Sequence, residues 1–421
     1  MDGGAAAMGA GFRSGGGGTN GGPLEITVTD PVKQGDGVNA YTSYRVTTKS
    51  PASEGEVYVI RRFSDFEWLH DRLGDLHRGA IVPPLPDKNV VEKFRFSREF
   101  VESRRRGLET FVRRVARHPV LGGAEELQHF LKDSEDRWTM EMRKTSESKL
   151  LGAKPSDFLS LFSSVQTTLA SAVLGREEVT EEAETERVRR YADALEKALT
   201  DCHRDALQFV KKQRELGASM CEFGVALQSL GQWEEGPLGK CFSEVGNKAD
   251  IVGSATRNNA QVFLENLEEP LREYVRFVTS LKKAISDRSL AWRNLNQLEA
   301  DVKAKKGKLH RAQATSMKQE KIEEIEKEIA DVSRKLEDSK KEHADVAQRL
   351  AGELQRCHVE MAADFDRMFR DFQAVQVRIM RQHSAAATFE TSQKESGVVC
   401  RCVAGRHSAA AQQHVQCCKA I

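Results

Sequence analysis

Long apolar runs are missing from this chain: no stretch of about 18 consecutive apolar residues occurs, so no transmembrane helix is predicted. Aromatic residues are scarce at 7%, while charged residues make up 30%, a balance that suits long solvated helices better than one large compact core. Eight cysteines in 421 residues do not make a disulfide scaffold and fit a reduced cytosolic setting. An excess of one charge is also absent, because 64 Lys and Arg oppose 63 Asp and Glu. An anionic partner must therefore be met by local basic patches.

The first part of the chain changes composition near residue 23. Residues 1–22 are rich in Gly and Ala without a hydrophobic signal core, so we expect a disordered lead rather than a secretory signal. Apolar and polar residues then alternate around residues 24–28, 44–46 and 56–60, which predicts three strands. Gly35-Asp36-Gly37 is a turn signal between the first two strands.

Helical spacing follows these strands. It predicts a helix from Ser64 to Leu76, a second from Phe100 to Val115 that stops before Pro119, and a third over residues 125–131. Pro83, Pro84 and Pro86 predict a stiff polyproline arm between the first two helices. We therefore expect residues 23–136 to form an α+β domain, with a small antiparallel sheet and helices packed on it.

Residues 137–176 are predicted to be a linker that contains an amphipathic helix. Between Asp157 and Leu174, apolar side chains recur at spacings of three and four with few charges between them, and they include Phe158, Leu161, Phe162 and Val165. One interpretation is a helix docked on a neighbouring domain. The other is a wedge that enters the headgroup layer of a membrane.

Residues 177–381 have helical spacing almost throughout. We expect three long helices, with breaks at Gly231 and at Gly236-Pro237 and a third helix starting near Gln319. Helices of this length must pack as an all-α coiled bundle, and their leftover apolar surface requires a partner. Pro270 predicts either a bend in the second helix or a break between two shorter ones. Residues 382–421 lose all periodicity, and we expect a divergent, disordered tail.

Three motifs carry the chemistry of the first domain. Arg61-Arg62-Phe63-Ser64 ends the third predicted strand, Lys88 ends the proline arm, and Arg104-Arg105-Arg106 lies in the second helix. Guanidinium groups match phosphate oxygens bidentately, a lysine offers a point charge to a second phosphate, and an aromatic face accommodates a sugar-like ring. Each residue alone fits an ordinary solvated charge, but the combination indicates a phosphoinositide site.

These motifs resemble the phox-homology (PX) domain. The resemblance rests on Arg62-Phe63-Ser64, the Pro-Pro-x-Pro-x-Lys loop ending at Lys88, and Arg104 before Gly107-Leu108-Glu109. Similarity to the PX-BAR sorting nexin family, of the plant-type sorting nexin 1 kind, runs from about residue 24 to about residue 376. It implies that residues 177–381 are a Bin/amphiphysin/Rvs (BAR) domain, a three-helix coiled coil that forms a homodimer.

The resemblance also implies roles for the motif residues. By this resemblance, Arg62 is expected to bind the 3-phosphate of phosphatidylinositol 3-phosphate, with Phe63 stacked on the inositol ring and Ser64 supporting the loop. Lys88 is expected to pair with the 1-phosphate, and Arg104 to bond the hydroxyls at positions 4 and 5.

A second basic cluster lies at the predicted turn between the second and third long helices. Its members are Lys303, Lys305, Lys306, Lys308 and Arg311. Each Lys or Arg near anionic lipid contributes about 1 kcal/mol of binding free energy, so this segment is a candidate membrane-contacting tip. The alternative is the solvated end of a coiled coil. The Cys and His residues of the tail match no common zinc pattern, and Cys418-Lys419-Ala420-Ile421 only superficially resembles a prenylation box. No metal and no cofactor are predicted.

No nucleophile–base pair, phosphate-cradling loop or catalytic carboxylate pair stands out, so we expect no enzyme. The expected function is a peripheral endosomal sorting nexin that binds phosphatidylinositol 3-phosphate and senses or induces curvature for retromer-type recycling. Expected partners are such membranes, a second copy or another sorting nexin, and the retromer cargo-selective complex, with no nucleic acid. Expected locations are the cytoplasm, early and late (prevacuolar) endosomes and the trans-Golgi network. The alternatives are a lipid-anchored coiled-coil scaffold that does not tubulate membrane and a PX-containing enzyme subunit.

Overall fold

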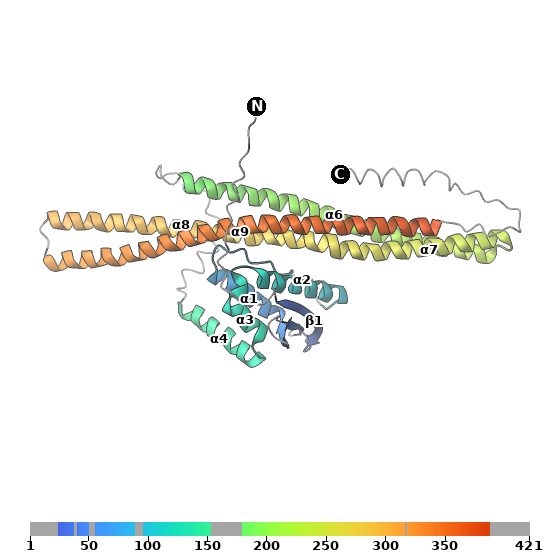
Figure 1. The fold of residues 1–421 in the computed structure, drawn as a ribbon, viewed down its shortest axis with the longest axis horizontal. Helices are drawn as coiled ribbons and strands as arrows, with labels where there is room; N and C mark the ends of the chain where they lie inside the picture. The colour runs from blue at the N-terminus through green and yellow to red at the C-terminus, as the bar shows by residue number, and fades with distance from the viewer. Residues whose placement is uncertain are drawn as a thin grey trace, which may run out of the picture. The chain divides into compact units, whose positions relative to one another are not determined.

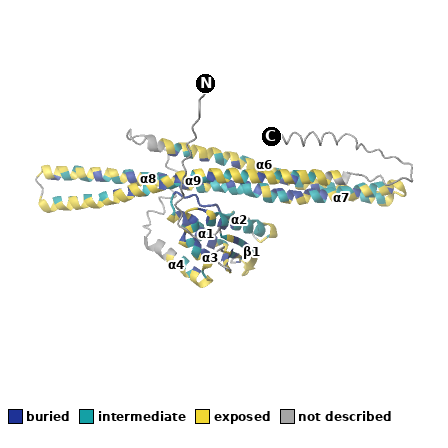
Figure 2. Ribbon diagram, viewed as in Figure 1, coloured by how far each residue is buried: buried dark blue, intermediate teal, exposed yellow. Residues whose placement is uncertain are grey.

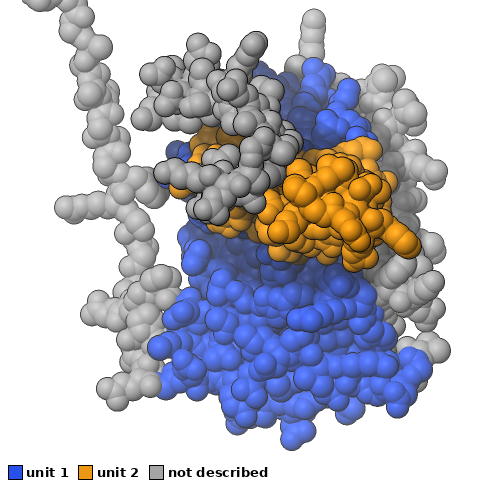
Figure 3. Space-filling view, turned by 90° about the vertical axis from the view of Figure 1, so that its right-hand side faces the viewer, with its two compact units in different colours: residues 1–210, 263–372 blue, residues 211–262, 373–421 orange. Residues whose placement is uncertain are grey.

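A computed structural model of the protein describes residues 24–37, 40–49, 55–88, 96–152, 179–315 and 318–387. The chain divides into two compact units, coloured in Figure 3: unit 1 comprises Met1–Val210 and Phe263–Phe372, and unit 2 comprises Lys211–Val262 and Gln373–Ile421. Within the described part of the chain, no helix combines the length and the apolar character needed to cross a bilayer.

Unit 1 contains the predicted α+β domain, whose sheet is a three-stranded antiparallel meander (Figure 1). Its strands are β1 (Glu25–Gln34), β2 (Tyr41–Lys49) and β3 (Glu56–Arg62). Val46 of β2 pairs with Val28 of β1 and with Val59 of β3, so one buried apolar row crosses the sheet. The predicted strands are thus confirmed.

Helices cover the inner face of this sheet. They are α1 (Phe63–Leu76), α2 (Arg98–Arg117), the short 3-10 helix η3 (Leu121–Gly123), α3 (Glu125–Lys132) and α4 (Glu135–Gly152). Phe66 forms the centre of the core, with its ring edge-on to Phe111 at 6.5 Å and to Phe130 at 4.9 Å between centroids. Helix α4 lies mostly in residues expected to form a linker, so the expected end of the domain at residue 136 is wrong. Its Trp138 is buried in the same core and packs edge-on against Phe130.

The rest of the described chain consists of long helices. They are α6 (Val179–Trp233), α7 (Pro237–Phe263), the π-helical turn η4 (Leu264–Glu268), α8 (Glu269–Ala314) and α9 (Gln319–Ala387). The predicted start at Gln319 is confirmed, but α9 continues to Ala387, so the expectation of a disordered tail from residue 382 is wrong for residues 382–387. A predicted break at Gly231 is wrong, since this residue lies inside α6; the interruption is at Gly236, whose φ of 81° favours glycine, followed by Pro237 at the start of α7.

Pro270 lies in the first turn of α8, directly after the π turn. Residues on both sides are helical, so the alternative of a break at Pro270 is wrong. A proline lacks the N–H for an α-helical bond, and its ring clashes with the carbonyl four residues earlier. The wider π turn accommodates both effects without ending the helix.

Two glycine series bring α6 and α7 together in unit 2. Each series repeats every seven residues, which keeps its members on one helix face, and they pair as Gly217 with Gly253, Gly224 with Gly246, and Gly231 with Gly239. A Cβ atom added to Gly217, Gly224 or Gly231 would lie 2.7 Å from the carbonyl oxygen of its partner. The two backbones therefore approach to a distance that only glycine permits.

Buried positions in the long helices of unit 1 form inward-facing stripes (Figure 2). Val278 and Leu281 of α8 belong to one apolar cluster with Leu350 of α9. Ile81, from the arm before Pro83, is part of the same cluster and is 1% exposed. The residues that begin the predicted stiff arm are thus buried and connect the α+β domain with the helices.

Candidate phosphoinositide-binding site

Arg61 and Arg62 are adjacent in sequence but lie on opposite faces of β3. Arg61 is 1% exposed, and its guanidinium donates hydrogen bonds to the carbonyls of Phe130 (3.0 Å), Ile60 (3.0 Å) and Asp133 (2.7 Å). Burial lowers the pKa of Arg61 to about 10, which leaves it charged at neutral pH. This arginine stabilises the domain and does not face a ligand.

Arg62 points outward, because side chains alternate along a strand, and its side chain is 51% exposed. Its backbone N–H donates to Asp65 Oδ2 at 2.8 Å, which closes the first turn of α1. Phe63 is the first residue of that helix and is half-buried, whereas Ser64 is exposed. The strand-to-helix junction therefore presents a cation, an aromatic ring and a hydroxyl in succession.

Arg104 of α2 connects the remaining motifs. Its guanidinium lies 4.4 Å from the centre of the Phe63 ring and 4.3 Å from that of Phe100. The same group donates to the carbonyl of Asp87 at 2.9 Å and to that of Lys88 at 3.3 Å. Phe63, Lys88 and Arg104 are thereby brought together, next to Arg62, from segments that are far apart in the sequence.

Lys88 ends the described part of the proline loop. Its side chain is 69% exposed, and its ammonium lies 2.9 Å from Glu67 Oε1 of α1. Upstream, Pro86 packs tightly on α2 at Gly107, where an added Cβ would lie 2.9 Å from the Pro86 Cβ. The arrangement offers cations around an aromatic ring, which is the chemistry that binds a phosphorylated sugar-like headgroup.

A cleft of about 260 Å³ lies beside this loop. Phe100, Arg104 and Gly107 line it from α2, and Pro270 and Arg276 line it from α8. The helical region therefore reaches the immediate neighbourhood of the candidate site, a feature that the sequence did not reveal.

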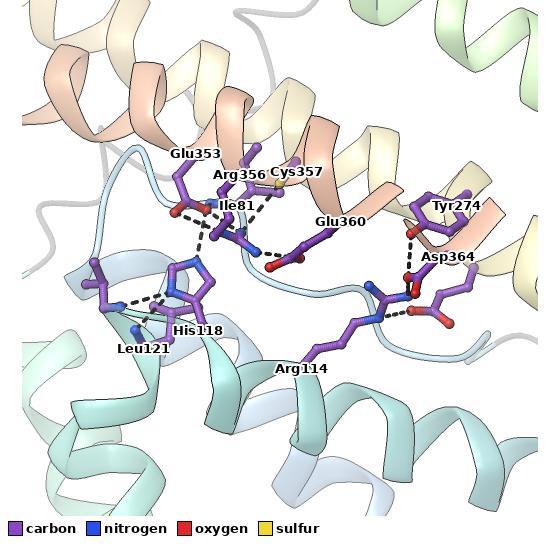
Figure 4. Close-up of polar contacts among 12 residues, drawn as sticks. Ile81, Arg114, His118, Leu121, Tyr274, Glu353, Arg356, Cys357, Glu360 and Asp364 are labelled. Carbon is purple, nitrogen blue, oxygen red and sulfur yellow. Dashed lines mark hydrogen bonds and ion pairs between the residues drawn. The ribbon is translucent and has the colours of Figure 1, made fainter. Parts of the chain in front are cut away.

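Arg114 of α2 forms the first of two polar contacts with the long helices drawn in Figure 4. Its guanidinium lies 2.7 Å from Glu273 Oε1 of α8 and 2.8 Å from Asp364 Oδ2 of α9. The Tyr274 hydroxyl donates to the same Asp364 oxygen at 2.7 Å. Burial lowers the pKa of Arg114, but the carboxylates outweigh this effect and raise it overall.

The second contact is a buried His118–Glu353 pair (Figure 4). His118 Nδ1 accepts hydrogen bonds from two backbone N–H groups of the following turn, each at 3.1 Å, so Nε2 carries the proton and donates to Glu353 at 2.9 Å. Glu353 also accepts from the Ile81 N–H at 3.1 Å and from Arg356 at 2.7 Å. Burial raises the pKa of Glu353, but the bonds from His118 and Arg356 dominate and hold it at about 2.

The predicted second basic cluster lies in the last turns of α8. Lys303, Lys306, Lys308 and Arg311 are exposed, whereas Lys305 is partly buried and pairs with Glu328 of α9. The predicted membrane-contacting residues Phe158, Leu161, Phe162 and Val165 lie outside the described residues, as do the Cys and His residues after Ala387. Among the described residues, no group of three His, Cys, Asp or Glu side chains is arranged to hold a metal ion.

Comparisons with known proteins agree with this architecture. The family model "PX domain" matches residues 50–134, and the model "Vps5 C terminal like" matches residues 160–394. Sorting nexin 1 of Arabidopsis thaliana is 39% identical over 361 residues, which are 85% of this chain and 89% of that protein. Sorting nexin-2 of Homo sapiens is 28% identical over 356 residues, which are 81% of this chain and 66% of that protein.

A solved structure supports the same fold. The cryo-EM structure of the SNX-BAR Mvp1 tetramer matches 86% of this chain and 100% of that chain, with a TM-score of 0.59 and 18% sequence identity. The α+β domain followed by long helices is therefore a PX domain followed by a BAR region. The chain belongs to the sorting nexin family. Membership of this family supports a role in membrane-associated sorting.

Proposed function

We propose that this chain is a non-catalytic peripheral protein of endosomal membranes that binds phosphatidylinositol 3-phosphate and senses or induces membrane curvature. The observation that carries the proposal is the position of Arg104, which contacts the Phe63 ring at 4.4 Å and the Lys88 carbonyl at 3.3 Å. This single residue joins the three motifs into one exposed, cationic site with an aromatic wall.

In the proposed complex, Arg62 binds the 3-phosphate, Phe63 stacks on the inositol ring and Ser64 supports the loop. Lys88 pairs with the 1-phosphate, and Arg104 bonds the hydroxyls at positions 4 and 5. Each charge-assisted contact contributes about 1.5–3 kcal/mol when partly dry. Arg104 already donates hydrogen bonds to the carbonyls of Asp87 and Lys88. A headgroup phosphorylated only at position 3 presents hydroxyls to Arg104 and leaves these bonds intact.

The BAR region acts as a dimer, formed with a second copy or with another sorting nexin. Support comes from large apolar side chains that unit 2 leaves exposed, namely Leu216, Phe223, Val225, Leu230, Trp233, Leu238, Ile251, Val377 and Met380. Trp233 alone is 87% exposed. Exposed apolar side chains in this number favour an interface with a second protein chain.

Further membrane contacts come from the basic cluster at the end of α8 and from the amphipathic segment with Phe158, Leu161, Phe162 and Val165. Several weak membrane contacts in one dimer give a high overall affinity, because the first contact raises the effective concentration of the others at the membrane. The proposed setting is the cytoplasmic face of early and prevacuolar endosomes and the trans-Golgi network. There the protein works with the retromer cargo-selective complex in recycling.

Sedimentation with vesicles tests the headgroup assignment. Vesicles of equal total charge are prepared with and without phosphatidylinositol 3-phosphate, and wild type is expected to bind the first selectively. Arg62→Ala and Lys88→Ala should each abolish this preference. Arg45→Ala is the matched control, because Arg45 is an exposed arginine of the neighbouring strand β2 that pairs with Asp30. Binding of wild type without headgroup selectivity would contradict the assignment.

Electron microscopy of the same vesicles tests curvature. Wild type is expected to produce uniform tubules, and the double change Phe158→Glu, Phe162→Glu should abolish them while headgroup selectivity persists. Selective binding by wild type without any tubules would instead favour the lipid-anchored scaffold.

A further inference from the structure

A salt bridge joins the loop that carries Lys88 to the BAR region. Arg276 of α8 lies with Nη1 3.1 Å from Asp87 Oδ2, and Asp87 directly precedes Lys88. The Arg276 side chain is 22% exposed and lies in the wall of the cleft beside the loop. A residue of a different domain thus contacts the segment that presents a headgroup-binding cation.

Asp87 is held from two sides. Its carboxylate receives Arg276, while its backbone carbonyl accepts a hydrogen bond from Arg104 at 2.9 Å. Pro86, one residue earlier, is packed on Gly107 of α2. The Lys88 ammonium is paired with Glu67, but most of its side chain is exposed, so these backbone contacts decide where it can reach a headgroup.

Other contacts keep α8 next to α2 independently of this pair. Arg106 forms a bidentate salt bridge with Glu269, with N–O distances of 2.9 and 2.8 Å. Arg272 donates a hydrogen bond to the Ser103 hydroxyl at 3.3 Å. Removing the Arg276 side chain should therefore release the loop without separating the PX domain from α8.

We propose that Arg276 is a positioning residue of the headgroup site, through which helix α8 sets the place of Lys88 relative to Arg62 and Arg104. This inference rests on the proposed function of the PX domain. Coupling of this kind is reciprocal. A headgroup that orders the Lys88 loop strengthens its attachment to α8, so lipid binding tightens the docking of the PX domain on the BAR region.

The test uses the full chain and the charge-matched vesicles described above. Arg276→Gln and Asp87→Asn are each expected to weaken binding that depends on phosphatidylinositol 3-phosphate at least about fivefold, and the double variant should lose little more. Each variant also changes the net charge near the site, so the readout is the ratio of the affinities for vesicles with and without this lipid, and this ratio should fall in both single variants. Exchanging the charges, with Asp87→Arg and Arg276→Asp together, should restore selective binding.

Arg272→Gln is the matched control, because it removes the same charge one turn earlier on α8 from a residue that contacts Ser103 rather than the loop. It should retain wild-type selectivity. If wild type is selective and Arg276→Gln equals it, or if the exchanged pair remains as weak as the single variants, the inference is overturned while the proposed function stands. If wild type itself shows no selectivity, the proposed function fails and the inference falls with it.

Discussion

The ammonium of Lys88 lies 2.9 Å from Glu67 Oε1. A carboxylate of α1 is therefore already paired with the cation that is proposed to bind the 1-phosphate. A headgroup phosphate therefore competes with this internal partner for the ammonium. Exposed ion pairs of this kind contribute about 0.2–1 kcal/mol. The pair therefore lowers the affinity of the site without blocking it.

Replacing this competitor should strengthen lipid binding. We expect Glu67→Gln to raise the affinity for vesicles with phosphatidylinositol 3-phosphate by up to about fivefold. Removing any nearby carboxylate also favours anionic membranes, so Asp75→Asn on the same helix is the control. The measurement is the ratio of affinities for lipid-containing and charge-matched vesicles, and an equal ratio in both variants would argue against competition at Lys88.

Replacing the adjacent residues Arg61 and Arg62 should have very different effects on the stability of the PX domain. Arg61→Ala leaves several buried carbonyls without their donor and should lower the free energy of unfolding of the PX domain by about 3 kcal/mol. Arg62→Ala should change it by less than about 0.5 kcal/mol, because the side chain is half exposed. Hydrogen exchange of amides in β3 and α3 measures both values. Equal destabilisation by the two variants would contradict this division of roles.

The glycine series of unit 2 should tolerate no added methyl group. Gly224→Ala places a Cβ 2.7 Å from the Gly246 carbonyl oxygen, and we expect a loss of about 1–3 kcal/mol in unfolding free energy despite the better helix propensity of alanine. Gly352→Ala on α9 is the control, since a Cβ there meets nothing within 4 Å. It should stabilise the helix by up to about 1 kcal/mol. Urea denaturation followed by circular dichroism compares them, and equal effects would refute close packing.

Acid should weaken the contact between the PX domain and α9. The pKa of Glu353 is lowered from 4.5 to about 2, so its charged form favours the folded state. That contribution, on the order of 3 kcal/mol, is complete above pH 4.5 and is lost as the pH falls towards 2. Glu353→Gln should therefore be less stable than wild type at pH 7, and the difference should shrink between pH 4.5 and 2. Urea titrations at each pH measure the difference, and a constant one would count against the ion pair.

Local patterns predicted most of the elements. Alternation located the strands that contain Val28, Val46 and Val59, and helical spacing located the long helices, including the start at Gln319. The same alternation contained the signal for Arg61, because residues two apart on a strand share a face and Val59 is buried. The seven-residue spacing of Gly217, Gly224 and Gly231 is likewise present in the sequence, but a glycine in a helix also predicts a break, and the close approach of α7 is what distinguishes the two.

The candidate site was only partly predictable, for a physical reason. Motif order identified Arg62, Lys88 and Arg104, and the structure brings the last two into contact. By contrast, the contacts of Arg276 and Glu353 join residues 189 and 235 positions apart. Such pairs leave no periodic trace in either segment, since Asp87 lies in a loop and His118 follows the end of α2, while Arg276 and Glu353 are single charged residues within long helices.

The burial of Ile81 in the helical core also affects how the chain is made. Its partners Val278 and Leu350 are synthesised about 200 and 270 residues later, which at about 5–20 residues per second is roughly 10–50 s. During that interval the newly made PX domain carries an uncovered apolar arm, and Arg114 and His118 lack their carboxylates. A PX domain cut away from its helices remains permanently in this unfinished state, and lipid affinities measured on it describe a different surface from that of the whole protein.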